Sequence, residues 1–203
     1  QVAWPRRPHY YSVPWRGRWA TELGGVLLRQ AVHAIDMLTY IAGPPTKVFA
    51  RVTTRVNDIE VEVCAAISLE LADGSPATIS ATLGSEQEIT RHRFHFANLS
   101  AESGTSAYEN SADPWDIRPD DDRAAAAIAE VVDGWEAGAE GWWGQFDRLG
   151  DWLDGRAPDL PVTLADARAS IELITAMYDS GRRGVDVELP LSPDHPLYDG
   201  WLP

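Results

Sequence analysis

A series of short extended segments, set between helical segments, is the feature that most constrains the fold of this chain. Residues 47–56 are rich in β-branched side chains, and residues 61–71 lead into Asp73-Gly74, a pair typical of hairpin turns. Residues 77–83 follow that turn, and residues 91–96 alternate polar and aromatic side chains as a half-exposed strand does. Consecutive strands with short connections pair side by side, so we expect an antiparallel meander.

Helical segments lie on both sides of these strands. A helix over Glu22–Ala42 is expected to stop at Gly43, because proline follows and cannot continue it. Later helices are expected over Arg123–Val132, around Trp142–Leu153, and from the capping-box pair Thr163 and Asp166 to Ser180, where Gly181 would end the last one. This order predicts an α+β fold: an open, mostly antiparallel β-sheet with helices packed on one face.

Composition excludes several classes of protein. The formal net charge of −14 repels phosphate backbones, so we expect no nucleic-acid partner. The single cysteine, Cys64, allows neither an intrachain disulfide nor a cysteine metal cluster. No apolar run is long enough to span a bilayer and no signal peptide is visible, so we expect no membrane partner and a cytoplasmic location. The acidic stretch around Asp113–Asp116 and Asp120–Asp122 is expected to be a solvated loop rather than a metal site.

The predicted first helix carries a polar stripe. Arg29, His33, Asp36 and Tyr40 follow one another at spacings of four, three and four residues, which places them within about 60° on a helical wheel. The rest of the helix is apolar nearly all round, which predicts a buried helix. A polar stripe on a buried helix needs partners, and a ligand in a cleft would supply them.

The side chains in this stripe suit proton transfer and substrate binding. His33 can give or take a proton near neutral pH, and Asp36 can orient its ring, so we predict these two as catalytic residues. Arg29 can bind a hydroxyl, carboxylate or phosphate, and Tyr40 can add a hydroxyl donor. The alternative is a structural polar cluster. Zinc is not expected, because only two ligands share the helix and no third lies nearby in the sequence.

Aromatic and basic residues before this helix suggest a sugar pocket. Arg16 and Trp19, together with Trp15, could line it, because flat aromatic rings pack against pyranose faces. The alternative is that these residues pack in the core and its loops. We therefore predict Arg29, Tyr40, Arg16 and Trp19 as substrate-binding residues.

Two stretches of the chain resemble the second domain of the Gfo/Idh/MocA oxidoreductases. The start of that domain is similar to Tyr10-Tyr11, Pro14–Trp19 and the run from Glu22 to Leu38 with its Gly24-Gly25, His33 and Asp36. Its closing helices and last strand are similar to Gln145–Leu153, Pro161–Thr163, Ser170–Leu173, Tyr178–Gly181 and Val187–Pro190. The order and spacing agree at both ends of the chain.

The resemblance implies a two-domain enzyme. An N-terminal Rossmann domain would bind NAD or NADP, and it is missing from this chain, which also lacks the family's Glu-Lys-Pro motif and has no assigned cofactor-binding residues. Residues 1–203 would form the C-terminal substrate-binding and oligomerisation domain, whose free sheet face would make a homodimer or higher oligomer. The reaction would be hydride transfer between a sugar or polyol carbon and the nicotinamide, with His33 as acid/base or substrate ligand. The isolated chain, expected to be a piece of a longer protein, should then be inactive.

One residue departs from the family pattern. Members that oxidise inositol have an aspartate four residues before the histidine, where this chain has Arg29. A cation at this position suggests a substrate with an acidic group, or a divergent activity. Two alternatives stay open: a non-catalytic binding or dimerisation module of the same fold, and a relative that uses NAD to cleave glycosides.

Overall fold

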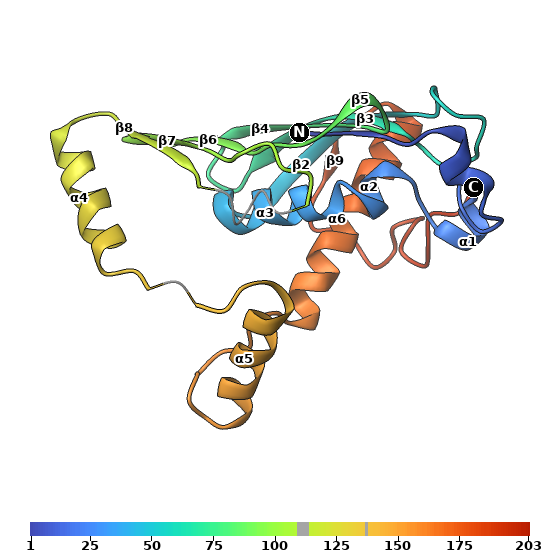
Figure 1. Cartoon of the computed structure of the whole chain (residues 1–203). Helices are drawn as coiled ribbons and strands as arrows, with labels where there is room; N and C mark the ends of the chain where they lie inside the picture. Colours follow the sequence, from blue (N-terminus) through green and yellow to red (C-terminus); the bar gives the residue numbers. More distant parts are fainter. Residues whose placement is uncertain (109–113, 137) are drawn as a thin grey trace.

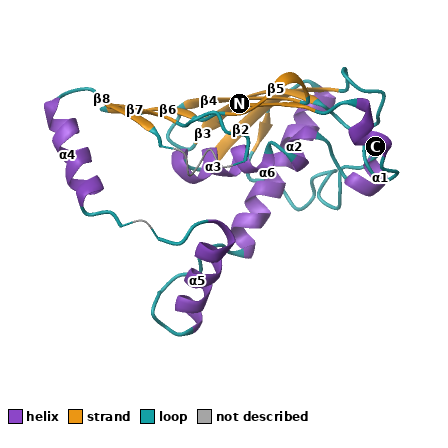
Figure 2. Ribbon diagram, viewed as in Figure 1, coloured by secondary structure: helices purple, strands orange, loops and turns teal. Residues whose placement is uncertain are grey.

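The protein contains two β-sheets and a set of helices (Figures 1 and 2). The computed structural model describes residues 1–108, 114–136 and 138–203. The strands are β1 (Val2–Pro5), β2 (Pro45–Thr53), β3 (Cys64–Leu71), β4 (Pro76–Thr82), β5 (Gly84–Thr90), β6 (Arg93–His95), β7 (Leu99–Glu102), β8 (Asp116–Pro119) and β9 (Val187–Glu188). The helices are η1 (Pro8–Ser12), α1 (Trp19–Glu22), α2 (Val26–Arg29), α3 (Val32–Ala42), α4 (Asp122–Asp133), α5 (Gly141–Leu153) and α6 (Leu164–Arg183).

The larger sheet has the strand order β5-β1-β4-β3-β2-β9. Its neighbouring strands are antiparallel except for β1 and β4, which run parallel. Helices α2, α3 and α6 lie on one side of this sheet, and no helix of the described residues lies on its other side (Figure 1). The predicted fold class is therefore confirmed.

The predicted meander is correct only for β2, β3 and β4. The N-terminal strand β1 inserts between β4 and β5, which the local sequence pattern does not show. The strands β6, β7 and β8 form a separate three-stranded sheet. The hydrophobicity pattern does not predict β5, because its side chains Ser85–Glu88 are polar and largely exposed.

The core lies between the larger sheet and helices α3 and α6. Alternate residues of β3 point into it, including Ile67 and Leu69, and α6 contributes Ile174 and Met177. Ile35 of α3 is fully buried, and burial of such a side chain contributes about 1.5–3 kcal/mol. This packing fixes the inner face of α3 and leaves the outer face available.

The end of α6 corrects one prediction. The capping box at Thr163 and Asp166 is present, as expected. The helix does not stop at Gly181 but continues to Arg183, where Gly184 takes a left-handed conformation. Gly181 instead allows close packing, because a Cβ there would lie 2.6 Å from a methyl group of Val52.

The prediction of a single helix over residues 22–42 is wrong. Leu23 has a φ of 63°, which ends α1. Between α2 and α3, the Ala31 N–H bonds the Val26 carbonyl oxygen at 2.7 Å, a step of five residues in place of four. The extra residue in this turn separates α2 from α3 and is typical of bulges near functional sites.

The acidic stretch is more ordered than predicted. Asp116–Pro119 forms β8, which pairs with β7. The carboxylate of Asp121 accepts a hydrogen bond from the Ala124 N–H at 2.7 Å and so caps α4. The expectation of a solvated loop is therefore wrong for these residues, while Asp113 lies outside the described residues. Among the helices in the described ranges, none is both long and apolar enough to cross a membrane.

Candidate functional site

The predicted polar stripe lies on the exposed face of α3. His33, Asp36 and Tyr40 are exposed, and Tyr40 is 86% accessible. Ala34 and Ile35 are buried on the opposite face. The prediction of a helix buried nearly all round is therefore wrong: α3 has one face in the core and a second, polar face open to a ligand or to another part of the protein.

Neighbouring elements hold some of these side chains. The Ser170 hydroxyl of α6 donates a hydrogen bond to Asp36 Oδ1 at 3.2 Å. The same hydroxyl lies 3.3 Å from the Asp166 carbonyl oxygen, so Ser170 is a neighbour that can orient the Asp36 carboxylate. The acid/base role of His33 and the orienting role of Asp36 stay predictions.

A buried carboxylate that the sequence reasoning missed holds the start of α2. Glu62 is 3% exposed and lies in the segment before β3. Its carboxylate accepts hydrogen bonds from the Gly25 N–H at 2.9 Å, the Leu27 N–H at 3.0 Å and the Tyr178 hydroxyl at 3.0 Å. Its carbonyl oxygen accepts the Val26 N–H at 2.9 Å. Glu62 therefore caps α2 from 37 residues away.

This contact explains the Gly24-Gly25 motif. A Cβ on Gly25 would lie 1.7 Å from the Glu62 carbonyl oxygen, and one on Gly24 would lie 2.4 Å from the Tyr178 hydroxyl. The two glycines thus permit a close approach of two backbone segments. The N–H groups that could bind a cofactor phosphate at this helix start already bind Glu62, so the glycine pair does not fit a nucleotide pyrophosphate.

Burial controls the ionisation of this cluster. It raises the pKa of Glu62 above its ordinary value, although the hydrogen bonds from Leu27, Gly25 and Tyr178 act in the opposite direction. Burial and the neighbouring Glu62 carboxylate also raise the pKa of Tyr178. The phenol is therefore a hydrogen-bond donor, and the cluster is structural.

Arginine and aromatic side chains alternate beside α2. The guanidinium carbon of Arg16 lies 3.8 Å from the centre of the Tyr10 ring and 4.9 Å from that of Trp15. The guanidinium of Arg29 lies 5.6 Å from the same Trp15 ring. We call Tyr10, Arg16, Trp15 and Arg29 the arginine–aromatic cluster. Two of the predicted substrate-binding residues, Arg16 and Arg29, therefore share one aromatic neighbour.

Trp19 lies in a different environment. Its ring packs edge-on against Tyr178, with ring centres 5.5 Å apart, and it borders the hydrophobic core. Its backbone N–H donates to the Glu60 carboxylate at 3.0 Å. The structure thus places Trp19 next to the Glu62 cluster and not within the arginine–aromatic cluster.

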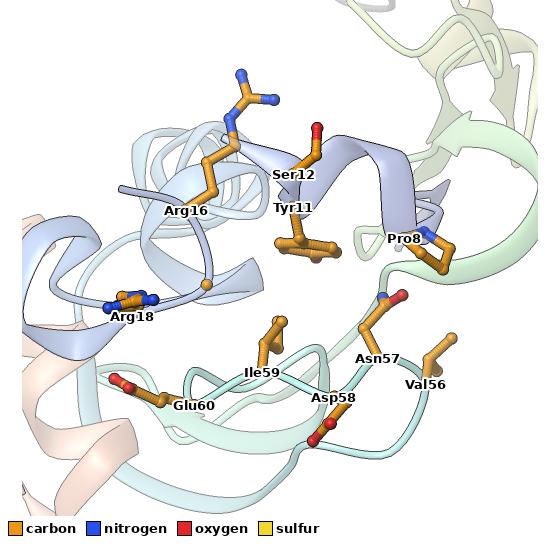
Figure 3. Close-up of a pocket in the computed structure, with 11 residues that line it drawn as sticks. Pro8, Tyr11, Ser12, Arg16, Arg18, Val56, Asn57, Asp58, Ile59 and Glu60 are labelled. Carbon is orange, nitrogen blue, oxygen red and sulfur yellow. The ribbon is translucent and has the colours of Figure 1, made fainter. Parts of the chain in front are cut away.

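A cleft elsewhere on the molecule does not contain the polar stripe. It has a volume of about 690 Å³ and lies between η1 and residues 56–60. Tyr11, Arg16, Arg18 and Glu60 are among the residues that line it, and Figure 3 shows that the guanidinium end of Arg16 points away from the other lining side chains. No residue of α3 lines this cleft. We therefore assign the candidate site to the side chains that can transfer protons and bind anions rather than to this cleft.

No cluster in the described ranges has the ligands of a metal site. Groups of three or more histidine, cysteine, aspartate or glutamate side chains that could hold an ion are not found there.

Comparison with known proteins assigns the family. A family model described as the GFO/IDH/MocA C-terminal domain matches residues 1–105, more than half of the chain. The chain belongs to the Gfo/Idh/MocA family. The resemblance drawn from the sequence motifs is thus confirmed, and the matched range includes His33, Asp36, Arg29, Tyr40, Arg16 and Trp19. No curated protein sequence matches the chain significantly.

Solved structures support the same fold. The WlbA dehydrogenase from Chromobacterium violaceum, in complex with NADH and UDP-GlcNAcA, is 26% identical with a TM-score of 0.74, covering 94% of this chain and 54% of that one. The Bordetella pertussis WlbA dehydrogenase, with the same two ligands, is 24% identical with a TM-score of 0.72 and the same coverage. An aldose–aldose oxidoreductase from Caulobacter crescentus, complexed with glycerol, is 19% identical with a TM-score of 0.68, covering 92% and 53%. This Gfo/Idh/MocA chain spans about half the length of these relatives.

Proposed function

We propose that this chain is the substrate-side domain of an NAD(P)-dependent oxidoreductase that acts on a sugar, polyol or related hydroxyl or carbonyl compound. The coenzyme would be held mainly by an N-terminal domain outside this chain, because the glycine pair here is occupied by Glu62. Relatives solved with NADH and a sugar nucleotide support this assignment. The isolated chain would then bind substrate without turning it over.

His33 is the proposed acid/base. When a secondary alcohol is oxidised, the hydroxyl proton leaves the oxygen as hydride leaves the carbon, and an exposed imidazole can accept that proton. In the reverse direction the imidazole returns the proton to the carbonyl oxygen. Asp36, held by Ser170, lies one helical turn away and would stabilise the charged ring. Tyr40 would add a hydroxyl contact further along the same face.

This proposal rests on the difference between the two faces of α3, one buried and one exposed. Its inner face is fixed by buried Ala34 and Ile35, while its outer face presents His33 and Asp36 without apolar cover. A rigid helix that projects a titratable pair outward is suited to a substrate cleft shared with a second domain. An exposed polar face alone would also suit a non-catalytic module, so the test must measure turnover.

The test is mutation of His33 in the full-length protein. With coenzyme and a panel of aldoses, uronic acids and cyclic polyols, we expect His33→Asn to lower kcat by about 10²- to 10⁴-fold with little change in coenzyme affinity. Thr39→Ser, on the same helix, is the matched control and should keep wild-type turnover. Unchanged turnover in His33→Asn would contradict the proposal and favour the non-catalytic module.

The open face of the larger sheet is the proposed surface for a homodimer. Small polar and apolar side chains face outward there, including Ala66 and Ser80, which pair across β3 and β4, and Ser68 and Thr78, which pair one step further along. Such a flat face can meet a second sheet closely. If it does so, Ser68→Arg should reduce the mass measured by light scattering to that of one protomer.

A further inference from the structure

Arg16 carries a positive charge that no carboxylate among the described residues neutralises. Among the described residues, no ion pair involves Arg16. Its Nη1 donates to the Tyr10 carbonyl oxygen at 3.1 Å, and its buried Nε has no hydrogen-bond partner. A guanidinium has five N–H donors in one plane, so most of the donor capacity of Arg16 is unused.

Stacking determines the direction in which Arg16 can bind a ligand. Tyr10 covers the guanidinium at 3.8 Å, and Trp15 lies 4.9 Å away. Aromatic rings occupy the faces of a guanidinium and leave the donors at its edge available. A planar, two-oxygen acceptor such as a carboxylate or phosphate fits that edge through paired hydrogen bonds.

Arg29 adds a second cation next to the same tryptophan. Its guanidinium lies 5.6 Å from the Trp15 ring and 3.6 Å from the Glu22 carboxylate, while 42% of its side chain is exposed. Glu22 is buried and also accepts the Gly17 N–H at 2.6 Å. Glu22 thereby positions Arg29, whose side chain stays partly accessible to a ligand.

The distribution of charge favours an anion in this region. Five of the 17 basic residues but only one of the 31 acidic residues lie within residues 1–29. Arg6, Arg7 and Arg29 pair with Glu88, Glu86 and Glu22, whereas Arg16 faces Trp15 and has no carboxylate partner among the described residues. The rest of the chain is strongly acidic and would repel an anion, so this region is the local exception.

We infer that Arg16 and Arg29, held by Tyr10, Trp15 and Glu22, bind the acidic group of an anionic sugar whose hydroxyl lies toward His33. The shared chemistry is a carboxylate or phosphate on a sugar ring: Arg16 would bind two of its oxygens, Arg29 would add charge, and Trp15 would pack against the ring. The link to turnover rests on the proposed oxidoreductase function, but the binding itself does not.

The experiment measures binding to this chain directly. Isothermal titration and arginine side-chain NMR would compare D-glucuronate, D-glucose 6-phosphate and neutral D-glucose, each at low and high salt. We expect one or both anions to bind, and glucose to bind at least about tenfold more weakly. The two anions distinguish a carboxylate from a phosphate, and binding should weaken as salt rises.

Arginine variants locate the site. Arg16→Gln and Arg29→Gln should each weaken anion binding at least tenfold, whereas Arg7→Gln, which removes an exposed arginine paired with Glu86, should leave it unchanged. Circular dichroism would establish that each variant is folded, and Arg29→Gln tests the site if Arg16→Gln unfolds. Equal binding of glucose and the anions, or equal losses in all three variants, would overturn the inference.

Measuring turnover in the full-length protein distinguishes a failure of the anion site from a failure of the proposed oxidoreductase function. If the full-length protein oxidises neutral sugars and shows no preference for the anions, the anion site is wrong and the oxidoreductase stands. If the chain binds the anions through Arg16 and Arg29 while the full-length protein turns over no sugar, the site stands and the oxidoreductase is wrong.

Discussion

Glu62 and Arg16 are charged groups on either side of the short helix α2. They differ in how many of their hydrogen-bonding atoms have partners. Glu62 is almost completely buried and accepts three hydrogen bonds, from Gly25, Leu27 and Tyr178. Arg16 lies over the rings of Tyr10 and Trp15, makes one backbone hydrogen bond and has no carboxylate partner among the described residues. A satisfied buried charge serves the fold, whereas a positioned charge with unused donors is available to a ligand. Changes at Glu62 should therefore mainly lower the free energy of unfolding, whereas changes at Arg16 should mainly weaken ligand binding.

Glu62→Ala should have the largest effect on stability. It leaves two backbone N–H groups and the Tyr178 hydroxyl buried without their acceptor, and each such group costs about 1–3 kcal/mol. We expect the free energy of unfolding to fall by about 3–5 kcal/mol in urea denaturation. A loss below about 1 kcal/mol would show that Glu62 is not the cap of α2.

Tyr178→Phe should have a smaller effect. It removes one hydrogen bond to Glu62 and keeps the ring that packs against Trp19 and Trp201. We expect a loss of about 1.5 kcal/mol, because Glu62 keeps its two backbone donors. Thr175→Ser, one turn earlier on α6, serves as the control. If Tyr178→Phe lost as much stability as Glu62→Ala, the view that the backbone donors hold most of the Glu62 carboxylate would be wrong.

The pH dependence of stability should show the buried carboxylate. Because burial raises the pKa of Glu62, folding favours the protonated form relative to the unfolded chain. Its contribution to stability is fully present below the ordinary value of 4.5 and is lost as pH rises through the raised value. The free energy of unfolding of the wild type should therefore fall with rising pH relative to that of Glu62→Gln, which cannot titrate. If the difference in free energy of unfolding between the wild type and Glu62→Gln stayed constant from pH 4 to pH 8, the raised pKa of Glu62 would be contradicted.

Arg16→Gln should have the smallest effect on stability. The change removes cation–π contacts worth about 0.5–1 kcal/mol and leaves no carboxylate unpaired. We expect the free energy of unfolding to change by less than about 1 kcal/mol in the urea experiment. A loss comparable to that of Glu62→Ala would mean that Arg16 is a structural residue like Glu62, and the comparison between the two sites would fail.

Local sequence patterns predict much of the sheet and both ends of the fold. Asp73-Gly74 predicts the β3–β4 hairpin, and the capping box at Thr163 and Asp166 predicts the start of α6. The spacing of His33, Asp36 and Tyr40 correctly places them on one face of a helix. These features depend on turn geometry and on hydrogen bonds between residues close in the chain, which a single sequence displays.

The candidate site is only partly visible in the sequence. Arg29 and His33 are placed together on a continuous helix by spacing alone, but the turn at Ala31 separates α2 from α3. Glu62 escapes prediction because it lies in an apolar run that resembles a strand. A glutamate within such a run, together with a glycine pair elsewhere, is the one signal that could have revealed this buried contact.

The sequence by itself determined the fold class and the family, since these follow from periodicity, capping and motif spacing. The residues proposed for proton and anion chemistry stay predictions. The tertiary structure decided where helices begin and end and which charges are satisfied. Glu62 approaches Gly25 across 37 residues, and Val52 fills the space that Gly181 leaves. Such contacts join segments far apart in the chain. Their energies depend on burial and on the distance between atoms, which the residues adjacent in sequence do not reveal.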